Sequence, residues 1–353
     1  MLESIKVNGQ GIVGVDLGDR ASQICRMDRE SGKILEETRL SMTTTSVQRY
    51  FSALEPQLVV LESGTHTPWM VRLLRQLGHG VLVANPSRVR AISASLRKTD
   101  ERDARCLAQL ARVDPQLLAP IQPRSEEFLQ ALAVVRAREG LVKARTMLIN
   151  QMRGMVKSSG FRLPSGSSAS FARKVQEALP EPLKAALEPL LRVIAELSEE
   201  IHGFDRDVEA WAKRWPVTER LRQIKGVGPL TALVYVLTLG DPDRFARSRA
   251  VGAYLGLVPA TRNSGNCAPQ LPISKQGDRL LRRLLVQASH YILGAFGQDS
   301  DLRRFGQRLA QRGGKNGKKR AVVAVARKLA VLLHRLWVSG TDYEPLRATA
   351  PTS

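Results

Sequence analysis

Residues 11–18, Gly-Ile-Val-Gly-Val-Asp-Leu-Gly, place a single acidic side chain inside an apolar run. The β-branched residues predict a β-strand over 12–17, and the alternation over 22–28 predicts a hairpin partner for it. An ionised carboxylate is costly to bury unless it pairs with a cation. Asp16 therefore prompts a search for other acids with which it shares a metal ion.

The residues that follow predict a mixed sheet with helices. Glu62 ends a continuous apolar run over 57–62, which is typical of a strand buried on both faces. A hairpin followed by alternating helices and strands indicates an α/β domain. We expect further strands over 33–40 and 80–84, and helices over 45–54, 68–77, 86–95 and 100–112.

Two more acids, Asp100 and Asp103, lie three residues apart at the start of the last of these helices, so they share one face. Four acids on three elements can converge on divalent cations. Hard carboxylate oxygens suit Mg²⁺, and a pair of ions can stabilise the attacking and leaving oxygens of phosphoryl transfer. The sequence thus predicts a site for two Mg²⁺ ions at Asp16, Glu62, Asp100 and Asp103. The alternative is that Asp100 and Asp103 only complement the helix dipole, and that Glu62 is an ordinary strand-end acid.

Changes in composition predict four segments. Residues 1–125 form the metal-binding α/β domain, and three prolines at 115, 120 and 123 close it. Residues 126–213 hold two long helices, over 126–158 and 183–211, which predict a helical, coiled-coil-like linker suited to dimerisation. Residues 214–300 form a helical domain, in which we expect helices over 245–257 and 274–293. Residues 301–353 form a basic tail, in which we expect a helix from residue 302, a break at Gly313-Gly314 and a second helix from Arg320.

The chain carries a formal net charge of +21 with 43% hydrophobic residues, which indicates a folded protein with a polyanionic partner. Residues 302–338 hold 11 basic residues and no acid, which favours a nucleic-acid surface over a generally solvated one. Three widely spaced cysteines form no disulfide framework. With no signal-peptide core and no spanning apolar run, we expect a cytoplasmic protein with no membrane partner.

Leu221 to Pro229, followed by an apolar helix, resembles a helix-hairpin-helix motif. Gly226 and Gly228 would let the turn present backbone N–H groups to a phosphate, next to Lys225. The alternative is an ordinary Gly-Pro turn between packed helices.

Two blocks of residues carry a family resemblance. Gly14-Val15-Asp16, Leu61-Glu62 and Lys98 to Ala104 resemble the Asp-Glu-Asp-Asp transposases of the IS110-type insertion sequences. Gly256-Leu-Val-Pro259, Ser264-Gly265 and Ile273-Ser274-Lys275-Gln-Gly277-Asp278 resemble the C-terminal domain of the same family. The resemblance spans roughly residues 11–300. It implies an RNase H-like, RuvC-type fold for the first domain.

The same resemblance implies that Ser264 is a nucleophile that attacks a DNA phosphate, with Ser274 as the second candidate. Alone, Ser264-Gly265 is an ordinary turn and Ser274 a helix cap. A serine hydroxyl needs a base, a metal or positive charge to react at neutral pH. Nearby cations can offset charge in the transition state. The predicted nucleic-acid contacts are Arg262, Lys275, Arg279, Arg282 and Arg283, with Lys315, Lys318, Lys319 and Arg320 in the tail.

The resulting hypothesis is a Mg²⁺-assisted DNA transposase that cuts, transfers and rejoins strands through a serine-linked intermediate. The resemblance implies double-stranded DNA partners at the element ends and the target, and a guide RNA encoded by the element. It also implies a composite site in a homodimer or homotetramer. Two alternatives stay open, which are a metal-only nuclease of the Holliday-junction type and a non-catalytic nucleic-acid-binding scaffold.

Overall fold

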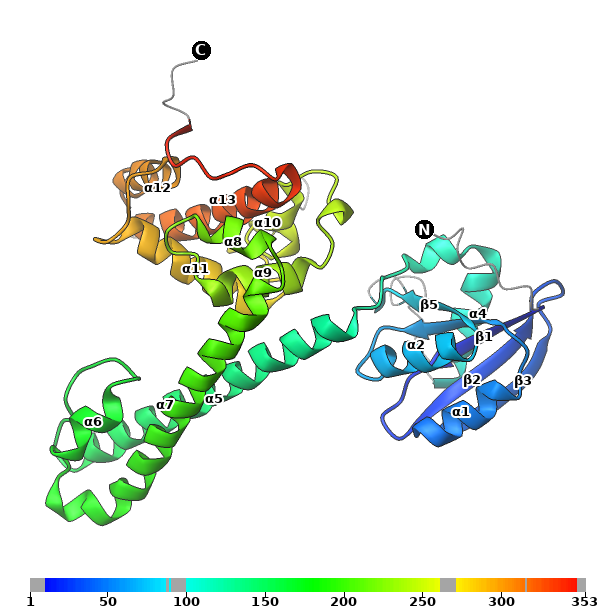
Figure 1. Ribbon diagram of the computed structural model, residues 1–353, viewed down its shortest axis with the longest axis horizontal. Coiled ribbons are helices and arrows are strands. Elements are labelled where there is room, and N and C mark those ends of the chain that lie inside the picture. The colour runs from blue at the N-terminus through cyan, green and yellow to red at the C-terminus, as the bar shows by residue number, and fades with distance from the viewer. Residues whose placement is uncertain (1–9, 87–88, 90–99, 261–270, 315, 348–353) are drawn as a thin grey trace. The chain divides into compact units, whose positions relative to one another are not determined.

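The computed structural model describes residues 10–86, 89, 100–260, 271–314 and 316–347, with residue 100 described in its backbone only. The chain divides into two compact units, Met1–Ser125 and Glu126–Ser353. Each unit is described here by itself (Figure 1). The boundary falls directly after the predicted proline-rich segment. Among the described residues, no helix is both long and apolar enough to cross a membrane.

The first unit is built on a five-stranded sheet in the order β3-β2-β1-β4-β5. Strands β1, β2 and β3 pair antiparallel, and β4 and β5 run parallel to β1. This confirms the predicted mixed sheet, and its strand order agrees with the RNase H-like fold that the resemblance implies. The strands are β1 (Gly11–Asp16), β2 (Ala21–Asp28), β3 (Ile34–Ser41), β4 (Leu58–Glu62) and β5 (Gly80–Ala84).

Helices cover both faces of this sheet. Alternation along β1 sends Val13 and Val15 into a core with α1 (Thr44–Ser52) and α2 (Thr67–Gln76). Ile12 lies in a separate core on the opposite face, which α4 (Asp100–Val113) covers together with the short helix η1 (Pro115–Leu118). Strands β1 and β4 read as continuous apolar runs because both of their faces are buried.

Gly14 controls how closely α4 approaches the sheet. A Cβ atom at this position would lie 2.0 Å from the backbone oxygen of Ala104 and 2.8 Å from the backbone nitrogen of Ala108. Glycine is therefore required in the middle of β1 because the α4 backbone rests directly on it. Ala104 and Ala108 are small and fully buried for the same reason.

The second unit begins with a pair of long helices. Helix α5 (Glu126–Ser158) and helix α7 (Lys184–Lys213) pack against each other. They run antiparallel, as the hydrogen bond from Arg138 in the first half of α5 to Asp205 in the second half of α7 shows. Further along α5, Arg145 meets Ser198. The short elements α6 (Phe171–Gln176) and η2 (Glu181–Leu183) close the far end. The second long helix thus returns antiparallel along the first (Figure 1).

The remaining helices form one continuous core with the near end of this hairpin. Helix α9 (Pro229–Leu239) is buried along almost its whole length. The hydroxyl of Tyr235 on this helix donates to the carbonyl oxygen of Ala330 at 2.7 Å. Burial raises the pKa of Tyr235 well above its ordinary value. The elements are α8 (Val217–Arg222), α9 (Pro229–Leu239), η3 (Pro242–Arg244), α10 (Ala250–Tyr254), α11 (Arg279–Leu293), α12 (Asp301–Gln311) and α13 (Gly317–Ser339).

Two sequence-based expectations need correction here. The segment predicted as a basic tail does contain the two expected helices, α12 and α13, but α13 is not a surface tail, because it contributes Val325, Leu329 and Leu333 to the core. Its cations are numerous, but its apolar residues recur at helical spacing and pack against α9 and α11. The single helix expected over 245–257 is also wrong. The chain instead forms η3, an irregular stretch and the five-residue α10.

We predict that Gly14→Ala lowers the free energy of unfolding of the chain by about 3 kcal/mol, because two backbones in contact have no room for the added methyl group. Gly64→Ala is the control, since a Cβ atom there meets nothing within 4 Å. It should change stability by less than about 0.5 kcal/mol. Urea unfolding of both variants measures the difference. Equal stabilities would show that α4 does not depend on close contact with β1.

Candidate active site and nucleic-acid interface

Asp16 and Glu62 lie side by side at the ends of neighbouring parallel strands. Val15 of β1 pairs with Leu61 of β4, so the next residue of each strand is its acid. Both acids follow the alternation of Gly14 and Val60, which puts them on the face of the sheet that α4 covers. Both side chains are partly exposed. The two carboxylates thus share one face and one edge of the sheet.

Helix α4 runs toward this edge at its N-terminal end. Near the C-terminal end of α4, the Arg112 guanidinium donates to Glu30 O at 3.3 Å, in the turn beside the start of β1. Eight residues earlier, Ala104 lies on Gly14 in the middle of β1. Four residues of a helix advance about 6 Å along its axis, and two residues of a strand advance about the same distance. The turn of α4 that precedes Ala104 therefore reaches the end of β1, two residues beyond Gly14.

This N-terminal turn carries the two remaining acids. Asp103 lies one turn before the buried Leu107, and position 100 lies one turn before the buried Ala104. Both positions therefore extend the helix face that packs on the sheet. Asp103 is partly exposed. The side chain of Asp100 lies outside the described residues.

The donor chemistry of these acids suits a hard cation, because Mg²⁺ prefers carboxylate oxygens. Within the described part of the chain, no three His, Cys, Asp or Glu side chains gather closely enough to hold a metal ion. Asp16 and Asp103 each already have an interaction partner. The structure thus brings the positions of the four acids to one edge, and their role as metal ligands stays a prediction.

Thr67, which the sequence did not single out, fixes the backbone next to Glu62. Its hydroxyl donates to the carbonyl oxygen of Glu62 at 3.1 Å and accepts from the N–H of Gly64 at 2.8 Å. Thr67 is buried. One side chain thereby holds both ends of the turn that follows the acid, which limits the positions that the Glu62 side chain can take.

The segment that contains Ser264 is anchored at both ends. Pro259 and Ile273 form an antiparallel bridge, and Ala260 donates through its backbone N–H to the oxygen of Pro272 at 2.9 Å. Ser264 and Arg262 lie outside the described residues, within 261–270. Ser274, the second candidate nucleophile, has a buried hydroxyl oxygen for which no hydrogen-bond partner appears in the described part of the chain. The hydroxyl oxygen of Ser274 is thus not exposed to solvent in this structure.

Glycines are required in the two C-terminal motif blocks because the backbones of the two blocks are in direct contact. Gly256 and Gly277 both have positive φ angles, of 66° and 75°. A Cβ atom on Gly256 would lie 2.3 Å from the backbone of Gln276, and one on Gly277 would lie 2.2 Å from the oxygen of Tyr254. Sequence reasoning associated these blocks with catalysis. The structure adds that they hold one another's backbones in contact.

Asp278 and Arg282 complete this contact between the two blocks. Asp278 is the N-cap of α11 and accepts from the N–H of Leu281 at 2.7 Å, a role that asparagine performs equally well. The Arg282 guanidinium donates to the oxygens of Leu255 at 3.0 Å and Gln276 at 2.7 Å. Arg282 was predicted to contact nucleic acid. In this structure it instead holds the two motif blocks together.

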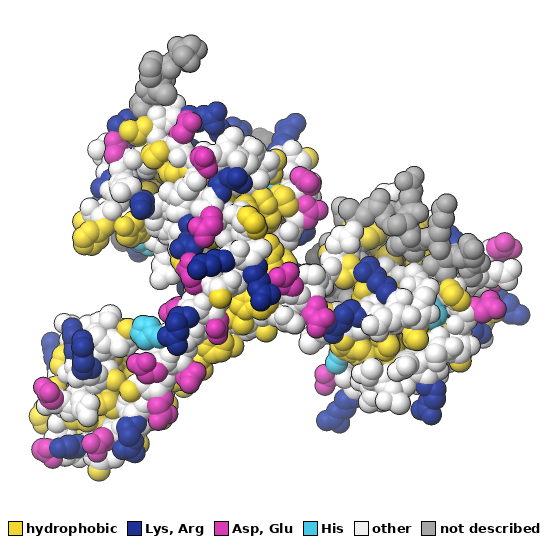
Figure 2. Space-filling view, in the orientation of Figure 1, with side chains coloured by type: hydrophobic (Ala, Val, Ile, Leu, Met, Phe, Trp, Pro, Cys, Tyr) yellow, Lys and Arg dark blue, Asp and Glu magenta, His cyan; other side chains and the backbone are white. Residues whose placement is uncertain are grey.

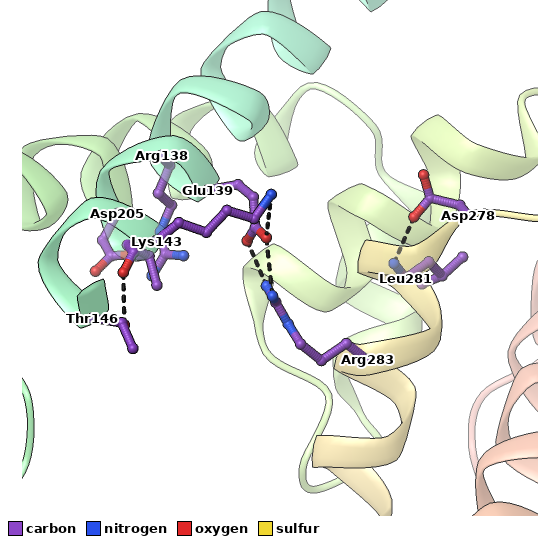
Figure 3. Close-up of polar contacts among 9 residues, drawn as sticks. Arg138, Glu139, Lys143, Thr146, Asp205, Asp278, Leu281 and Arg283 are labelled. Atoms are coloured by element: carbon purple, nitrogen blue, oxygen red, sulfur yellow. Dashed lines mark hydrogen bonds and ion pairs between the residues drawn. The ribbon is translucent and has the colours of Figure 1, made fainter. Parts of the chain in front are cut away.

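Arg283 also has an internal partner. It donates from Nη1 to the Glu139 carboxylate at 2.9 Å, and the second nitrogen reaches the other oxygen, so that α11 is joined to α5 (Figure 3). Partial burial alone would raise the pKa of Glu139. The hydrogen bonds from Arg283 and Lys143 outweigh it and hold that pKa below its ordinary value. Arg283 therefore already neutralises a largely buried acid.

At Gly226, in the turn between α8 and α9, the structure favours the alternative of an ordinary turn between packed helices. This residue has a φ of 102°, and a Cβ atom there would lie 3.0 Å from the Tyr291 ring and 3.2 Å from the oxygen of Ala288. Gly226 is thus needed for a left-handed backbone pressed against α11. Gly228 is the N-cap of α9, with nothing within 4 Å of a Cβ atom. A role of the turn in phosphate binding stays a prediction.

The other predicted nucleic-acid contacts are on the surface. Those that the structure describes are Lys225, Lys275, Arg279, Lys318, Lys319 and Arg320, and all six are exposed. Lys275 has a positive φ of 56°, which is uncommon for a residue with a side chain. Lys318, Lys319 and Arg320 lie in the first turn of α13. Lys315 lies outside the described residues.

Comparison with known proteins identifies the class. A protein-family model described as a transposase matches residues 13–160, and a second family model, described as the transposase IS116/IS110/IS902 family, matches residues 218–304. The transposase of insertion sequence IS1111A from Coxiella burnetii is 30% identical, over 96% of this chain and 92% of its own length. A probable family 20 transposase from Pseudomonas aeruginosa is 29% identical, over 94% and 98% of the two chains. The transposase of IS1328 from Yersinia enterocolitica is 30% identical over 79% and 82%.

The protein is thus a transposase. More particularly, the chain belongs to the IS116/IS110/IS902 family, as the sequence motifs predicted. Among solved structures, RuvC of Thermus thermophilus in complex with a Holliday junction substrate matches with 12% identity and a TM-score of 0.25, over 30% of this chain and 98% of that chain. A score this low supports no inference, so the RNase H-like assignment depends on the strand order itself.

We predict that Arg283→Ala destabilises the chain by about 1 kcal/mol at pH 7, because Glu139 keeps its charge and loses its partner. The pKa of Glu139 is depressed in the folded state, so its stabilising contribution is present above the ordinary pKa of 4.5 and is lost as pH falls. The stability difference between wild type and variant should therefore shrink below about pH 4.5. Urea unfolding at pH 7 and pH 4 measures it, and a difference independent of pH would contradict this role.

Proposed function

We propose that this transposase cuts, transfers and rejoins DNA strands through a covalent serine intermediate, at a site that carboxylate-bound Mg²⁺ assists. The observation that carries the proposal is the adjacency of Asp16 and Glu62 at the ends of paired parallel strands, on the face that α4 reaches with its first turn. Two acids on neighbouring strand ends, with two more in the first turn of α4, carry like charges that a bound cation would offset.

The chain's own acids would hold the metal ions. We assign Asp16, Glu62, Asp100 and Asp103 as ligands for two Mg²⁺ ions. When bound, Mg²⁺ supplies positive charge that stabilises the oxygens of a phosphodiester undergoing substitution. The Gly14 contact and the hydrogen bonds of Thr67 would keep the acids in place before the ions bind, which lowers the cost of assembling the site.

We assign Ser264 as the nucleophile. Its hydroxyl oxygen forms a bond to phosphorus as one phosphorus–oxygen bond of the DNA strand breaks, and the leaving strand oxygen takes up a proton. The hydroxyl of another strand later attacks the same phosphorus, which joins the two strands and releases the serine hydroxyl. Three features support the assignment over Ser274. They are the order of the motifs, the anchored ends of the segment at Ala260 and Pro272, and the buried hydroxyl of Ser274.

The partners belong to the same proposal. The substrates are the double-stranded ends of the element and its target, and the guide is a structured RNA that the element encodes. The reaction needs the carboxylates and the serine at the same phosphate, in one chain or across a homodimer or homotetramer. The protein would act on nucleoid DNA in the bacterial cytoplasm.

A strand-transfer assay separates this function from its alternatives. The reaction contains the element ends, a target duplex, Mg²⁺ and RNA transcribed from the non-coding flank of the element. We expect Ser264→Ala to reduce strand transfer by about 10³-fold or more and to abolish the covalent adduct of protein and DNA on a denaturing gel. Ser274→Ala is the control, which should retain the adduct, and omission of the RNA should abolish site-specific transfer.

Other outcomes favour other functions. If Ser264→Ala still cleaves and Asp16→Asn does not, the protein is a metal-only nuclease. If both variants act like wild type, the acids and the serine are structural and the scaffold alternative is correct.

A further inference from the structure

A buried histidine attaches an arginine-rich segment to α13. His334 lies in α13 and is almost fully buried. Its Nε2 atom lies 3.0 Å from the oxygen of Pro242, and its Nδ1 atom lies 3.0 Å from the hydroxyl of Ser248. A carbonyl oxygen only accepts, so Nε2 donates to Pro242, and Nδ1 shares a hydrogen bond with the hydroxyl of Ser248. One imidazole thus holds both ends of the segment Pro242–Ser248.

This attachment turns two arginines outward. Ser248 points toward His334, and its neighbours Arg247 and Arg249 are both exposed. The third arginine, Arg244, is used internally, since it lies over the rings of Phe245 and Tyr254 and donates to the oxygen of Leu239. Residues 242–249 therefore use one arginine in their own structure and present two to solvent.

Helix α13 continues this basic surface. Arg320, Arg327 and His334 are spaced seven residues apart and so lie along one face of the helix, about 10 Å from one to the next. The stem of Arg327 lies beside Gly252 of α10, where a Cβ atom would be 3.1 Å from its Cγ atom. Arg249 is the N-cap residue of α10, less than one turn before Gly252. We call Arg247, Arg249, Arg320 and Arg327 the arginine strip.

The charges around the arginine strip are unbalanced. Residues 244–260 and the whole of α13 contain no Asp or Glu. Among the described residues, no ion pair involves any of the four strip arginines, whereas Arg222, Arg283 and Arg304 each pair with an acid. The nearest acids in sequence are Asp241, just before the segment, and Asp243 within it, and Asp241 accepts from the N–H of Asp243 in their own turn. The strip thus keeps four uncompensated positive charges on one surface.

We propose that the arginine strip binds successive phosphates of a nucleic-acid backbone during transposition. Guanidinium groups are the preferred protein donors to phosphate oxygens. Because α13 lies in the core and His334 fixes the segment upon it, the backbone that carries the four arginines is held in place before binding, which limits the conformational entropy lost. Contacts to phosphates position a strand without reading its sequence. This inference rests on the proposed function and extends it to residues outside the catalytic motifs.

The test is the salt dependence of binding by the full chain. The probes are a fluorescent 30-base-pair DNA duplex and, separately, an RNA hairpin. The strip variant is Arg247→Ala with Arg249→Ala, and a second variant is Arg327→Ala. The control is Arg192→Ala with Arg206→Ala on α7, where both arginines are exposed. Figure 2 shows acidic and basic side chains intermixed along the α5–α7 hairpin, so the control removes the same charge from a balanced surface.

Each lost phosphate contact reduces the slope of log affinity against log salt concentration by about 0.9 for duplex DNA, and by somewhat less for RNA. We expect the double strip variant to lose about two units of slope and about tenfold or more in affinity at 150 mM salt. Arg327→Ala should lose about one unit. A change with only one probe also supports the inference, and it identifies whether DNA or RNA occupies the strip.

Unchanged slopes with both probes, or an equal loss in the α7 control, would overturn the inference and leave the proposed function intact. If the wild-type chain binds neither probe at 50 mM salt, the proposed function fails as well. Melting temperatures should not differ among the variants, because all the altered side chains are exposed. A lowered melting temperature confined to the strip variants would attribute their weaker binding to misfolding and overturn the inference.

Discussion

The contact between Gly14 and the backbone of α4 determines the architecture of the first unit. A helix usually lies about 10 Å from a sheet, and side chains fill the space between them. Here the missing side chain of Gly14 and the small Ala104 and Ala108 let the two backbones touch. That contact fixes both the distance of α4 and its position along β1. The first turn of α4 consequently reaches the strand ends where Asp16 and Glu62 lie.

Backbone contact of the same kind organises the C-terminal motifs. Gly256 and Gly277 each let the chain approach a backbone that a side chain would block, and Arg282 joins the same two blocks through their carbonyl groups. The motif residues that the sequence associated with catalysis thus also hold together the two backbone segments that flank the Ser264 segment. A nucleophile needs such support because small displacements are costly for catalysis.

Sequence patterns predicted the first unit well because its strands are short, apolar and punctuated by acids and glycines. The bounds of β1, β4 and β5, and of α5 in the second unit, were each predicted within about one residue. The patterns failed where charge and burial conflict. The many cations of α13 suggested a tail, although Val325, Leu329 and Leu333 recur at core spacing. Arginine roles were hardest to predict, because only tertiary structure shows that Arg282 and Arg283 already have partners. In the part of the chain that the structure describes, no ion pair involves Arg247 or Arg327.

The central claim is that the carboxylates at the strand ends hold Mg²⁺, and a calorimetric titration of the full chain with Mg²⁺ tests it most directly. The account predicts saturable binding to wild type that falls at least about tenfold in affinity in Asp16→Asn. It also predicts no change in Asp19→Asn, an acid three residues away whose side chain is 96% exposed. Equal binding by wild type and Asp16→Asn, or no binding by either, would contradict the account.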